Sequence, residues 1–363
     1  IDISTEKESD DFSYPPIPAD TPYYDVERKQ HQVYVSSLVG SMGKRKIEFN
    51  YGFQDYDYNS ESFDETSPYY ISEETLNTFK GVFKVDNFLN KTVTIIGLSE
   101  RTGVAVAEKM IDLGAKVIIS DIKNREDLKP QLSLLSKYDN ITYDLGGHSD
   151  QILETDLIVL SPGVPPDLDI LKKAVESQIE VISEIELAFR LTEANIIGIT
   201  GTNGKTTVTS LTGHILKQNL DCKVRIAGNI GSPLITEITG LKKEDWLVVE
   251  LSSFQLEKIK HFKPHMGLFL NFSPDHLDRH KSVDNYWQAK KRIFENQKQD
   301  DIAVINYDDQ YLRKNLTDLN SNTYKVTNNL EIDQGIYYNE DSIYYIQKFV
   351  EGKSKIMETS QIP

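Results

Sequence analysis

The chain has 363 residues, and its 56 acidic residues outnumber the 40 basic ones, which gives a net charge of −16 and an isoelectric point near 5.0. This excess argues against a nonspecific binder of nucleic acid or of anionic membranes, because both need a positive field. No apolar run approaches the roughly 20 residues of a membrane-spanning helix, so we expect no membrane insertion. A single cysteine, Cys222, and an opening without an apolar signal segment favour a reducing, cytoplasmic location.

The first ninety residues differ in composition from the rest of the chain. They hold 17 acidic and 8 basic residues and 9 of the 19 tyrosines. Prolines among Asp, Glu and Ser predict an extended or disordered stretch at 1–25. The segments 32–39 and 46–53, on either side of a turn at 40–43, predict a β-hairpin. We therefore expect residues 1–90 to be an acidic, tyrosine-rich extension, partly disordered and without chemistry of its own.

A strand–helix–strand unit opens the next part of the chain, residues 91–195. An apolar strand at 92–97 runs into a turn, a helix is expected at 103–113, and Gly114 stands where a helix C-cap would be. The further expected elements are strands at 116–120, 157–163 and 179–182 and helices at 167–177 and 184–191. Strands that alternate with helices of this length predict an α/β domain with a mostly parallel, doubly wound sheet.

A second series of strands and helices occupies residues 196–363. Its expected strands are 196–200, 246–251, 266–272 and 302–306; its expected helices run from the first strand to about 217 and from 283 to 296; a hairpin is expected at 335–346. Two of these strands, 246–251 and 266–272, are apolar enough to be buried on both faces. We expect a second α/β domain, whose elements stop at Pro363 without an obvious end.

Directly after the strand 196–200 comes a glycine-rich segment, Gly201-Thr202-Asn203-Gly204-Lys205-Thr206-Thr207, which opens a helix. This is the context of a phosphate loop, in which glycines let backbone amides approach the phosphates and the helix N-terminus adds a positive dipole. In such a loop Lys205 would reach the β- and γ-phosphates, and Thr206 could ligate Mg²⁺. The alternative is a plain glycine-rich turn. The longer phosphate-loop pattern has glycine where this chain has Ile199.

The shorter pattern is found in ligases that add amino acids in cell-wall and folate metabolism, and other motifs follow the order of that family. They are GLSERTG (97–103), LSPGVP (160–165), SEIELA (183–188), GTNGKTT (201–207), AGNIG (227–231), ELSSFQL (250–256), NFSPDHLDRH (271–280) and AKKRIFENQ (289–297). With these motifs, residues from about 91 to 363 resemble the Mur ligase family, and ELSSFQL resembles the branch that adds D-glutamate. The first ninety residues lie outside the resemblance.

The resemblance implies an ATP-dependent amide-bond ligase of peptidoglycan precursor synthesis. It implies a Rossmann-like UDP-binding domain at 91–195, a phosphate-loop-type ATP-binding central domain at 196–363, and ATP and Mg²⁺ as cofactors. The implied substrates are UDP-N-acetylmuramoyl-L-alanine (UDP-MurNAc-L-Ala) and D-glutamate, with no nucleic acid and no obligatory protein partner. Members of the family also carry a third domain that closes over the ATP. Since none of its motifs is found here, we expect a truncated central domain and no dipeptide product from residues 1–363 alone.

The resemblance assigns metal binding to three residues besides Thr206. Glu250, at the end of an apolar strand, matches a Mg²⁺-binding glutamate of the family, and His276 matches its metal-binding histidine. Lys290 matches a lysine that the family carbamylates, so that a cation becomes a carboxylate able to hold a second Mg²⁺. From position alone, these would be a solvated acid, a structural histidine and a solvated helical lysine. The catalytic candidates are Lys205, His276 and Lys290.

Five residues are implied to contact the substrate. They are Thr102, Asp121 and Gly163 on the uridine nucleotide, Asn229 on the diphosphate side, and Gln255 next to the metal site. An acid at the end of a second strand, as Asp121 is, contacts ribose or base in Rossmann-like domains, and Phe254 is expected in the core. The loop from Gly97 to Gly103 is one residue longer than in typical members, and it lacks the G-x-G-x-x-G pattern of redox dinucleotide sites.

The implied reaction begins with attack of the substrate carboxylate on the γ-phosphorus of ATP, which gives an acyl phosphate that the amine of D-glutamate then attacks. Three alternatives stay open. They are a nonenzymatic module that binds nucleotide and UDP-sugar, an NAD-linked oxidoreductase built on residues 91–195, and a sister ligase with another acceptor. Binding of ATP together with UDP-MurNAc-L-Ala would favour a ligase or a module, whereas binding of NAD alone would favour the oxidoreductase.

Overall fold

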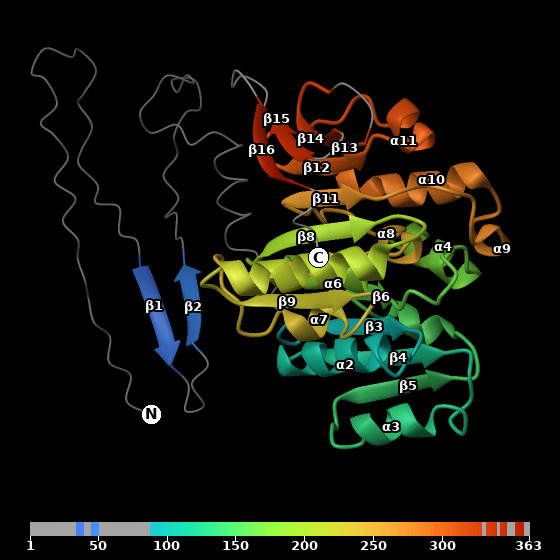
Figure 1. The fold of residues 1–363 in the computed structure, drawn as a ribbon. Coiled ribbons are helices and arrows are strands. Elements are labelled where there is room, and N and C mark those ends of the chain that lie inside the picture. The colour runs from blue at the N-terminus through green and yellow to red at the C-terminus, as the bar shows by residue number, and fades with distance from the viewer. Residues whose placement is uncertain are drawn as a thin grey trace, which may run out of the picture. The chain divides into compact units, whose positions relative to one another are not determined.

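The computed structural model describes residues 88–328, 332–339, 342–346 and 353–358, and the backbone of 34–39 and 45–50 (Figure 1). The chain divides into two compact units, residues 1–76 and 77–363. In the first unit, β1 (Tyr34–Val39) and β2 (Arg45–Asn50) pair antiparallel, which confirms the expected hairpin. The turn of this hairpin, the stretch 1–25 and the tyrosine-rich segment that follows the hairpin lie outside the described residues.

The first sheet of the second unit has five parallel strands in the order β5-β4-β3-β6-β7. The strands are β3 (Thr92–Ile96), β4 (Lys116–Asp121), β5 (Ile141–Leu145), β6 (Leu157–Leu160) and β7 (Glu180–Ser183). The helices are α2 (Thr102–Asp112), α3 (Lys129–Leu135), α4 (Asp169–Glu176) and α5 (Glu184–Arg190), with a 3-10 turn η1 (Asp150–Leu153). We call residues 92–190 the first lobe.

The expected strands and helices of the first lobe are confirmed, although the strand that begins at Leu157 ends at Leu160, before the turn that was included in it. α3 and β5 were not predicted. β5 is an edge strand whose residues are half-buried with no alternation, so neither an apolar run nor a period of two marks it in the sequence.

Glycine is required where β3 turns into α2. Gly97 has a φ of 89°, a conformation that disfavours any side chain. A Cβ at Gly103 would lie 2.6 Å from the carbonyl oxygen of Gly97, so the helix can start this close to the strand only with glycine at that position. At the other end, Gly114 follows α2 with a φ of 86°, as expected of a helix C-cap.

The second sheet has nine strands in the order β16-β15-β14-β13-β12-β11-β8-β10-β9, parallel from β9 to β14 and antiparallel beyond. The strands are β8 (Asn195–Thr200), β9 (Val224–Gly228), β10 (Trp246–Glu250), β11 (Met266–Phe269), β12 (Ile302–Asn306), β13 (Asn322–Thr327), β14 (Gly335–Asn339), β15 (Ser342–Ile346) and β16 (Lys353–Glu358). The helices are α6 (Lys205–Asn219), α7 (Leu234–Glu237), α8 (Ser253–Leu256), α9 (Leu277–His280), α10 (Val283–Lys291) and α11 (Gln310–Asn315). We call residues 195–358 the second lobe.

The expected strands and the hairpin at 335–346 are confirmed in the second lobe, although the strand that begins at Met266 ends at Phe269 and not at Phe272. The helix expected at 283–296 is shorter, because α10 ends at Lys291 and the chain continues as a 3-10 turn, η2 (Arg292–Phe294). The limits 91–195 and 196–363 for two domains stay a prediction, since contacts group residues 77–363 into one unit.

The middle of the second sheet brings together the ends of three buried strands. β8 pairs with β10 on one side, with Glu250 opposite Ile199, and with β11 on the other, with Phe269 opposite Thr200. α6 packs on β8, β9 and β10, and in the view of Figure 1 it lies between β8 and β9 and runs roughly along them. Ligands of open α/β sheets bind beyond the carboxyl ends of the strands. The residues that follow β8, β10 and β11 therefore share one edge.

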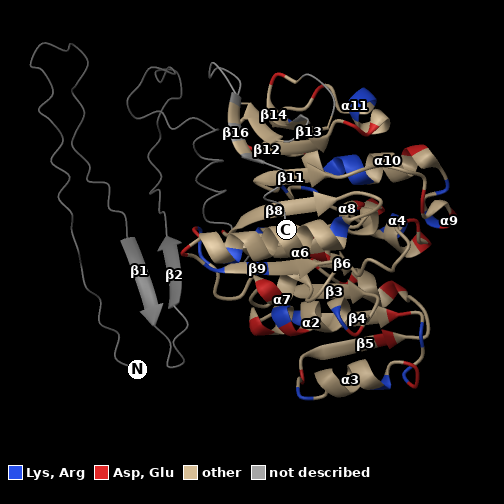
Figure 2. Cartoon of the chain, in the orientation of Figure 1, with Lys and Arg blue, Asp and Glu red and all other residues tan. Residues whose placement is uncertain are grey.

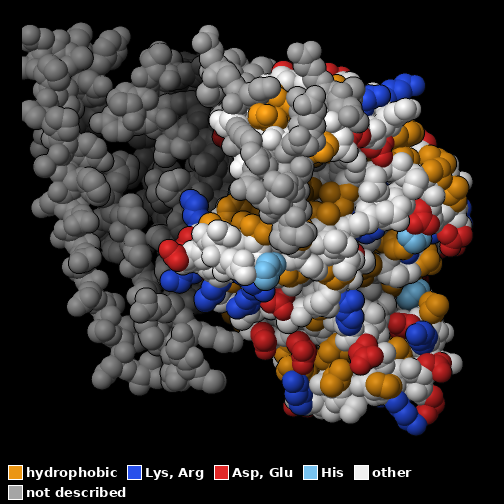
Figure 3. All heavy atoms as spheres, viewed as in Figure 1, with side chains coloured by type: hydrophobic (Ala, Val, Ile, Leu, Met, Phe, Trp, Pro, Cys, Tyr) orange, Lys and Arg blue, Asp and Glu red, His pale blue; other side chains and the backbone are white. Residues whose placement is uncertain are grey.

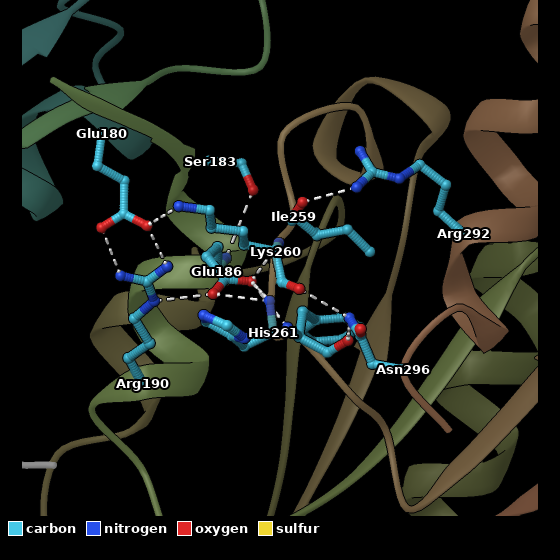
Figure 4. Close-up of polar contacts among 10 residues, drawn as sticks. Glu180, Ser183, Glu186, Arg190, Ile259, Lys260, His261, Arg292 and Asn296 are labelled. Carbon is cyan, nitrogen blue, oxygen red and sulfur yellow. Dashed lines mark hydrogen bonds and ion pairs between the residues drawn. The ribbon is translucent and has the colours of Figure 1, made fainter. Parts of the chain in front are cut away.

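A buried ion cluster on α5 joins the two lobes (Figure 4). Glu186 is fully buried and accepts hydrogen bonds from the backbone amides of residues 260–262, at 2.7–3.0 Å, and from Arg190 Nε at 2.8 Å. Arg190 also forms two hydrogen bonds of 2.9 Å with Glu180, whose pKa it lowers to about 2. Backbone of the second lobe is thus bound directly by side chains of the first lobe.

Charged side chains of both signs are interspersed along the helices and loops of both lobes (Figure 2), and the face in Figure 3 shows the same mixture. No helix among the described residues is both long and apolar enough to cross a bilayer.

Candidate nucleotide and metal site

The glycine-rich segment after β8 forms the loop that opens α6. Gly204 has a φ of 78° and directly precedes α6, whose first turn has no side-chain cap among the described residues. Asn271, from the loop after β11, accepts hydrogen bonds through Oδ1 from the amides of Thr202 (3.1 Å) and Asn203 (2.8 Å). An uncapped N-terminus of a 15-residue helix, held in place by a neighbouring strand end, is suited to a phosphate group.

Two lysines reach the same carbonyl group of this loop. Lys205 Nζ donates to the carbonyl oxygens of Gly201 (3.1 Å) and Thr202 (2.9 Å). Lys290 Nζ donates to the carbonyl oxygen of Gly201 at 2.7 Å and lies 4.9 Å from the ring centroid of Tyr286. The structure thus brings Lys290 from α10 to the loop, although 89 residues separate it from Gly201 in the sequence.

Lys290 is 2% exposed, unlike an ordinary helical lysine. Burial and the neighbouring charge of Lys205 lower its pKa to about 7, against the opposing charges of Asp275 and Glu250. A large fraction of this side chain is therefore a neutral amine near neutral pH.

Glu250 lies at the end of β10 and is 1% exposed. Its Oε2 accepts a hydrogen bond from Thr206 Oγ1, and its Oε1 accepts one from Asn229 Nδ2, both at 2.8 Å. The backbone amide of Asn229 also donates to the main-chain oxygen of Glu250 at 2.9 Å. A buried carboxylate, a hydroxyl of the glycine-rich loop and an amide from the AGNIG motif therefore meet at one point.

His276 is placed less tightly than the other predicted metal ligands. It follows β11 with a φ of 51°, its side chain is 52% exposed, and its Nε2 lies 3.6 Å from Asp275 Oδ2. Its ring centroid lies 5.1 Å from that of Phe254. Within the described part of the chain, no three or more His, Cys, Asp or Glu side chains form a group that could hold a metal. The role of His276 as a metal ligand therefore stays a prediction.

The first-lobe residues predicted to contact a nucleotide lie at the ends of neighbouring strands. Asp121 is buried at the end of β4, and its oxygens accept hydrogen bonds from the amides of Leu98 (2.7 Å) and Lys123 (2.9 Å). Thr102 is the first residue of α2, and Gly163, after β6, is exposed with open space where a Cβ would be. Asp121 therefore fixes the loop after β3, whether or not it also contacts a ligand.

Gln255 and Phe254 both lie on α8, shortly after β10. Gln255 is buried, and its Oε1 accepts hydrogen bonds from the amide and the hydroxyl of Ser252 at 3.0 Å, in a capping box at the start of α8. The expectation that Phe254 belongs to the core is wrong: its side chain is only partly buried, and the guanidinium carbon of Arg279 lies 4.3 Å from its ring centroid. The Ser-x-x-Gln spacing signals the cap in the sequence.

Two residues beside this site were given no role from the sequence. His280 is buried, its Nε2 lies 2.9 Å from Ser253 Oγ, and burial lowers its pKa. Arg279 Nη2 donates to Glu257 Oε2 (2.8 Å) and to the carbonyl oxygen of Val164 (2.9 Å) in the first lobe. No local pattern marks either contact, because their partners lie in other segments of the chain.

Comparison with known proteins assigns a family to both lobes. Residues 199–362 match the Mur ligase middle domain, and residues 91–183 match the MurD-like N-terminal domain of Mur ligases. The chain belongs to the Mur ligase family. Among solved structures, a Mur ligase from Neisseria meningitides, UDP-N-acetylmuramate:L-alanyl-gamma-D-glutamyl-meso-diaminopimelate ligase, overlays with a TM-score of 0.48 and 18% identity, over 71% of this chain and 85% of that one.

Three curated relatives carry the name UDP-N-acetylmuramoylalanine–D-glutamate ligase. The protein from Alkaliphilus oremlandii is 42% identical over 260 residues, which are 71% of this chain and 57% of that protein. The protein from Thermoanaerobacter sp. strain X514 is 44% identical (70% and 56%), and that from Geotalea uraniireducens is 43% identical (75% and 59%). The chain of this Mur ligase family member thus spans a little more than half the length of these relatives.

The residues at the loop fit a magnesium ion. Thr206 and Glu250 supply a hydroxyl and a carboxylate oxygen, which are the hard ligands that Mg²⁺ takes in sites shared with nucleotide phosphates. Their oxygens already lie 2.8 Å apart, and Asn229 holds the second carboxylate oxygen. Lys290 would add a further oxygen ligand only as a carbamate.

Proposed function

We propose that the protein is the part of an ATP-dependent amide-bond ligase that binds UDP-MurNAc-L-Ala and ATP, for the addition of D-glutamate in peptidoglycan precursor synthesis. One observation carries the proposal: Lys205, Thr206 and Glu250 converge at the end of β8 and β10, in a chain more than 40% identical to proteins named for this reaction. Phosphate transfer from ATP needs a cradle of amides, a lysine and a magnesium-binding carboxylate in one place.

The residues of the glycine-rich loop bind the nucleotide. The amides at the N-terminus of α6, at residues 204–207, and the ammonium group of Lys205 neutralise the β- and γ-phosphates, and Lys205 exchanges its carbonyl contacts for phosphate oxygens. Thr206 and Glu250 would hold Mg²⁺, which neutralises charge on the phosphates as the carboxylate of the substrate approaches. The carboxylate attacks the γ-phosphorus, ADP leaves, and the acyl phosphate is attacked by the amine of D-glutamate with loss of phosphate.

The first lobe holds the UDP part of the substrate. The N-terminus of α2 gives a site for phosphate, and Thr102, Asp121 and Gly163 lie at the same edge of the first sheet. Asn229 and Gln255 are proposed on the side of the second lobe, with His276 and a carbamylated Lys290 next to the reacting phosphate. Catalysis in this arrangement is positioning and charge neutralisation.

Calorimetric titration tests the proposal with four separate ligands: Mg-ATP, UDP-MurNAc-L-Ala, UDP-MurNAc and NAD. We expect binding of Mg-ATP, binding of UDP-MurNAc-L-Ala in preference to UDP-MurNAc, and no binding of NAD. Preference for UDP-MurNAc would point to a sister ligase, and binding of NAD without ATP would contradict the proposal.

A further inference from the structure

Gly228, the last residue of β9, and Asn229, the first residue of the loop that follows, both contact Glu250, the proposed magnesium ligand. Besides the two hydrogen bonds from Asn229, the backbone of Gly228 packs so closely on Glu250 that a Cβ there would lie 2.3 Å from the main-chain oxygen of Glu250. Any shift of residues 228–231 therefore moves the amide that holds Glu250 Oε1.

Side chains of the first lobe bind this loop and the start of the helix α7 that follows it. Arg101 Nη2, in the loop before α2, donates to the carbonyl oxygens of Gly231 and, at 3.4 Å, of Gly228. At the far end, Glu184 Oε1 accepts a hydrogen bond of 2.7 Å from the amide of Ile235. α7, which follows the loop, packs against α2 and α5 of the first lobe. The segment that carries Asn229 is thus held by the first lobe, which we propose to bind the UDP part of the substrate.

We infer that Arg101 is a positioning residue for the magnesium site. It fixes the carbonyl groups on either side of Asn229, and Asn229 in turn keeps the Glu250 carboxylate directed at Thr206. The inference rests on the proposed function, in which Thr206 and Glu250 hold the Mg²⁺ of Mg-ATP. Residues that orient a metal ligand from behind, without touching the metal, affect metal affinity by about 10–100-fold when they are changed.

The identity of the side chain matters at this position. A guanidinium group carries several donors in one plane and can serve two carbonyl oxygens at once, whereas an ammonium group is a compact point charge. Arg101 is exposed, so its contacts add little to the free energy of unfolding. Its effect should therefore be seen in metal-dependent binding rather than in stability.

The test is ATP affinity, measured by calorimetry at saturating Mg²⁺ and again in EDTA. The variants are Arg101→Ala, Arg101→Lys, Asn229→Ala and the double variant Arg101→Ala/Asn229→Ala. Lys109→Ala is the matched control, because Lys109, on α2, also reaches the second lobe, where its Nζ donates to Thr239 Oγ1 (3.3 Å) and not to the loop after β9. A cooperative transition in urea shows that each variant is folded. If Arg101→Ala shows no such transition, Arg101→Met, which keeps the aliphatic part of the side chain, takes its place.

We expect Arg101→Ala to weaken Mg-ATP binding about tenfold and to leave ATP binding in EDTA as in the wild type. Arg101→Lys should recover part of the loss, the double variant should bind no more weakly than Asn229→Ala, and Lys109→Ala should bind like the wild type. Equal weakening with and without Mg²⁺, or losses that add in the double variant, would overturn the inference. If the wild type binds no Mg-ATP, the proposed function itself fails, whereas unchanged Mg-ATP binding in Arg101→Ala defeats only the role of Arg101.

Discussion

Glu184 and Glu186 lie two residues apart on α5, and each accepts hydrogen bonds from backbone amides of a different segment of the second lobe, the start of α7 and residues 260–262. Their protonation equilibria differ. Burial raises the pKa of Glu184 to about 7, because the hydrogen bond from Ile235 and the charge of Arg101 offset only part of the effect of burial. Burial also acts on Glu186, but three amides and Arg190 outweigh it, so the pKa of Glu186 lies below its ordinary value. The same helix turn thus carries two carboxyl groups with opposite effects on pH-dependent stability.

Glu184→Gln should change how stability depends on pH. The pKa of Glu184 is about 7 in the fold against 4.5 in the unfolded chain, so the unfolded state loses this proton first. The protonated Glu184 therefore contributes its full share to the free energy of unfolding below pH 4.5. This contribution falls by about 3 kcal/mol as the pH rises through 7. The glutamine keeps an acceptor for the Ile235 amide and has no proton to lose. Urea unfolding should show the variant more stable than the wild type at pH 8 and similar at pH 5. Equal stabilities at both pH values would contradict the raised pKa.

Glu186→Gln should destabilise the protein by about 3–5 kcal/mol at pH 7, because it leaves Arg190 and the amides of 260–262 around a group that no longer carries charge. The folded pKa is lowered, so this stability is present above pH 4.5 and is lost as pH falls further. Urea unfolding measures it, with the exposed Glu193→Gln as the control. A loss no larger than that of Glu193→Gln would show that the cluster in Figure 4 does not stabilise the junction.

Lys205→Ala should weaken Mg-ATP binding by roughly ten- to a hundredfold, since a hydrogen bond to a charged group contributes about 1.5–3 kcal/mol. Binding of UDP-MurNAc-L-Ala should stay nearly unchanged. The control is Lys217→Ala, which removes an exposed lysine from the last turn of the same helix. Calorimetry that gives the same Mg-ATP affinity for Lys205→Ala and Lys217→Ala would remove Lys205 from the site.

Lys290 should react with carbon dioxide, because its buried amine is neutral to a large extent near pH 7 and lies beside the loop. After incubation with ¹³C-labelled bicarbonate and Mg²⁺, carbon NMR should show a carbamate signal that is absent from Lys290→Arg. Lys291→Arg is the neighbouring control and should keep the signal. A carbamate signal that survives in Lys290→Arg would place the modification elsewhere.

Local patterns predicted most of the fold, because buried parallel strands are continuous apolar runs. The strands 92–96, 116–121, 195–200 and 246–250 are of this kind. β5, β9 and β13 were not predicted, because their residues are mostly half-buried and form no continuous apolar run.

The site was predicted as far as it is local. The glycine-rich loop and its helix follow from one segment, whereas Glu250 lies near Thr206 because β10 pairs with β8, an order of strands that we did not predict. The contacts of Asn229 with Glu250 and of Arg101 with the loop depend on how distant segments pack, so no spacing in the sequence reveals them. The burial of Lys290, on a helix with polar and charged neighbours, is of the same kind.

The central claim is that one chain binds Mg-ATP at residues 201–207 and the UDP-sugar at the edge of the first sheet, in two separate sites. The most direct test is calorimetric titration of UDP-MurNAc-L-Ala into protein already saturated with Mg-ADP, with bound ADP followed at the same time. We expect one UDP-MurNAc-L-Ala to bind per chain while Mg-ADP stays bound. Displacement of Mg-ADP by the UDP-sugar, or no binding of UDP-MurNAc-L-Ala, would contradict the assignment of the two lobes.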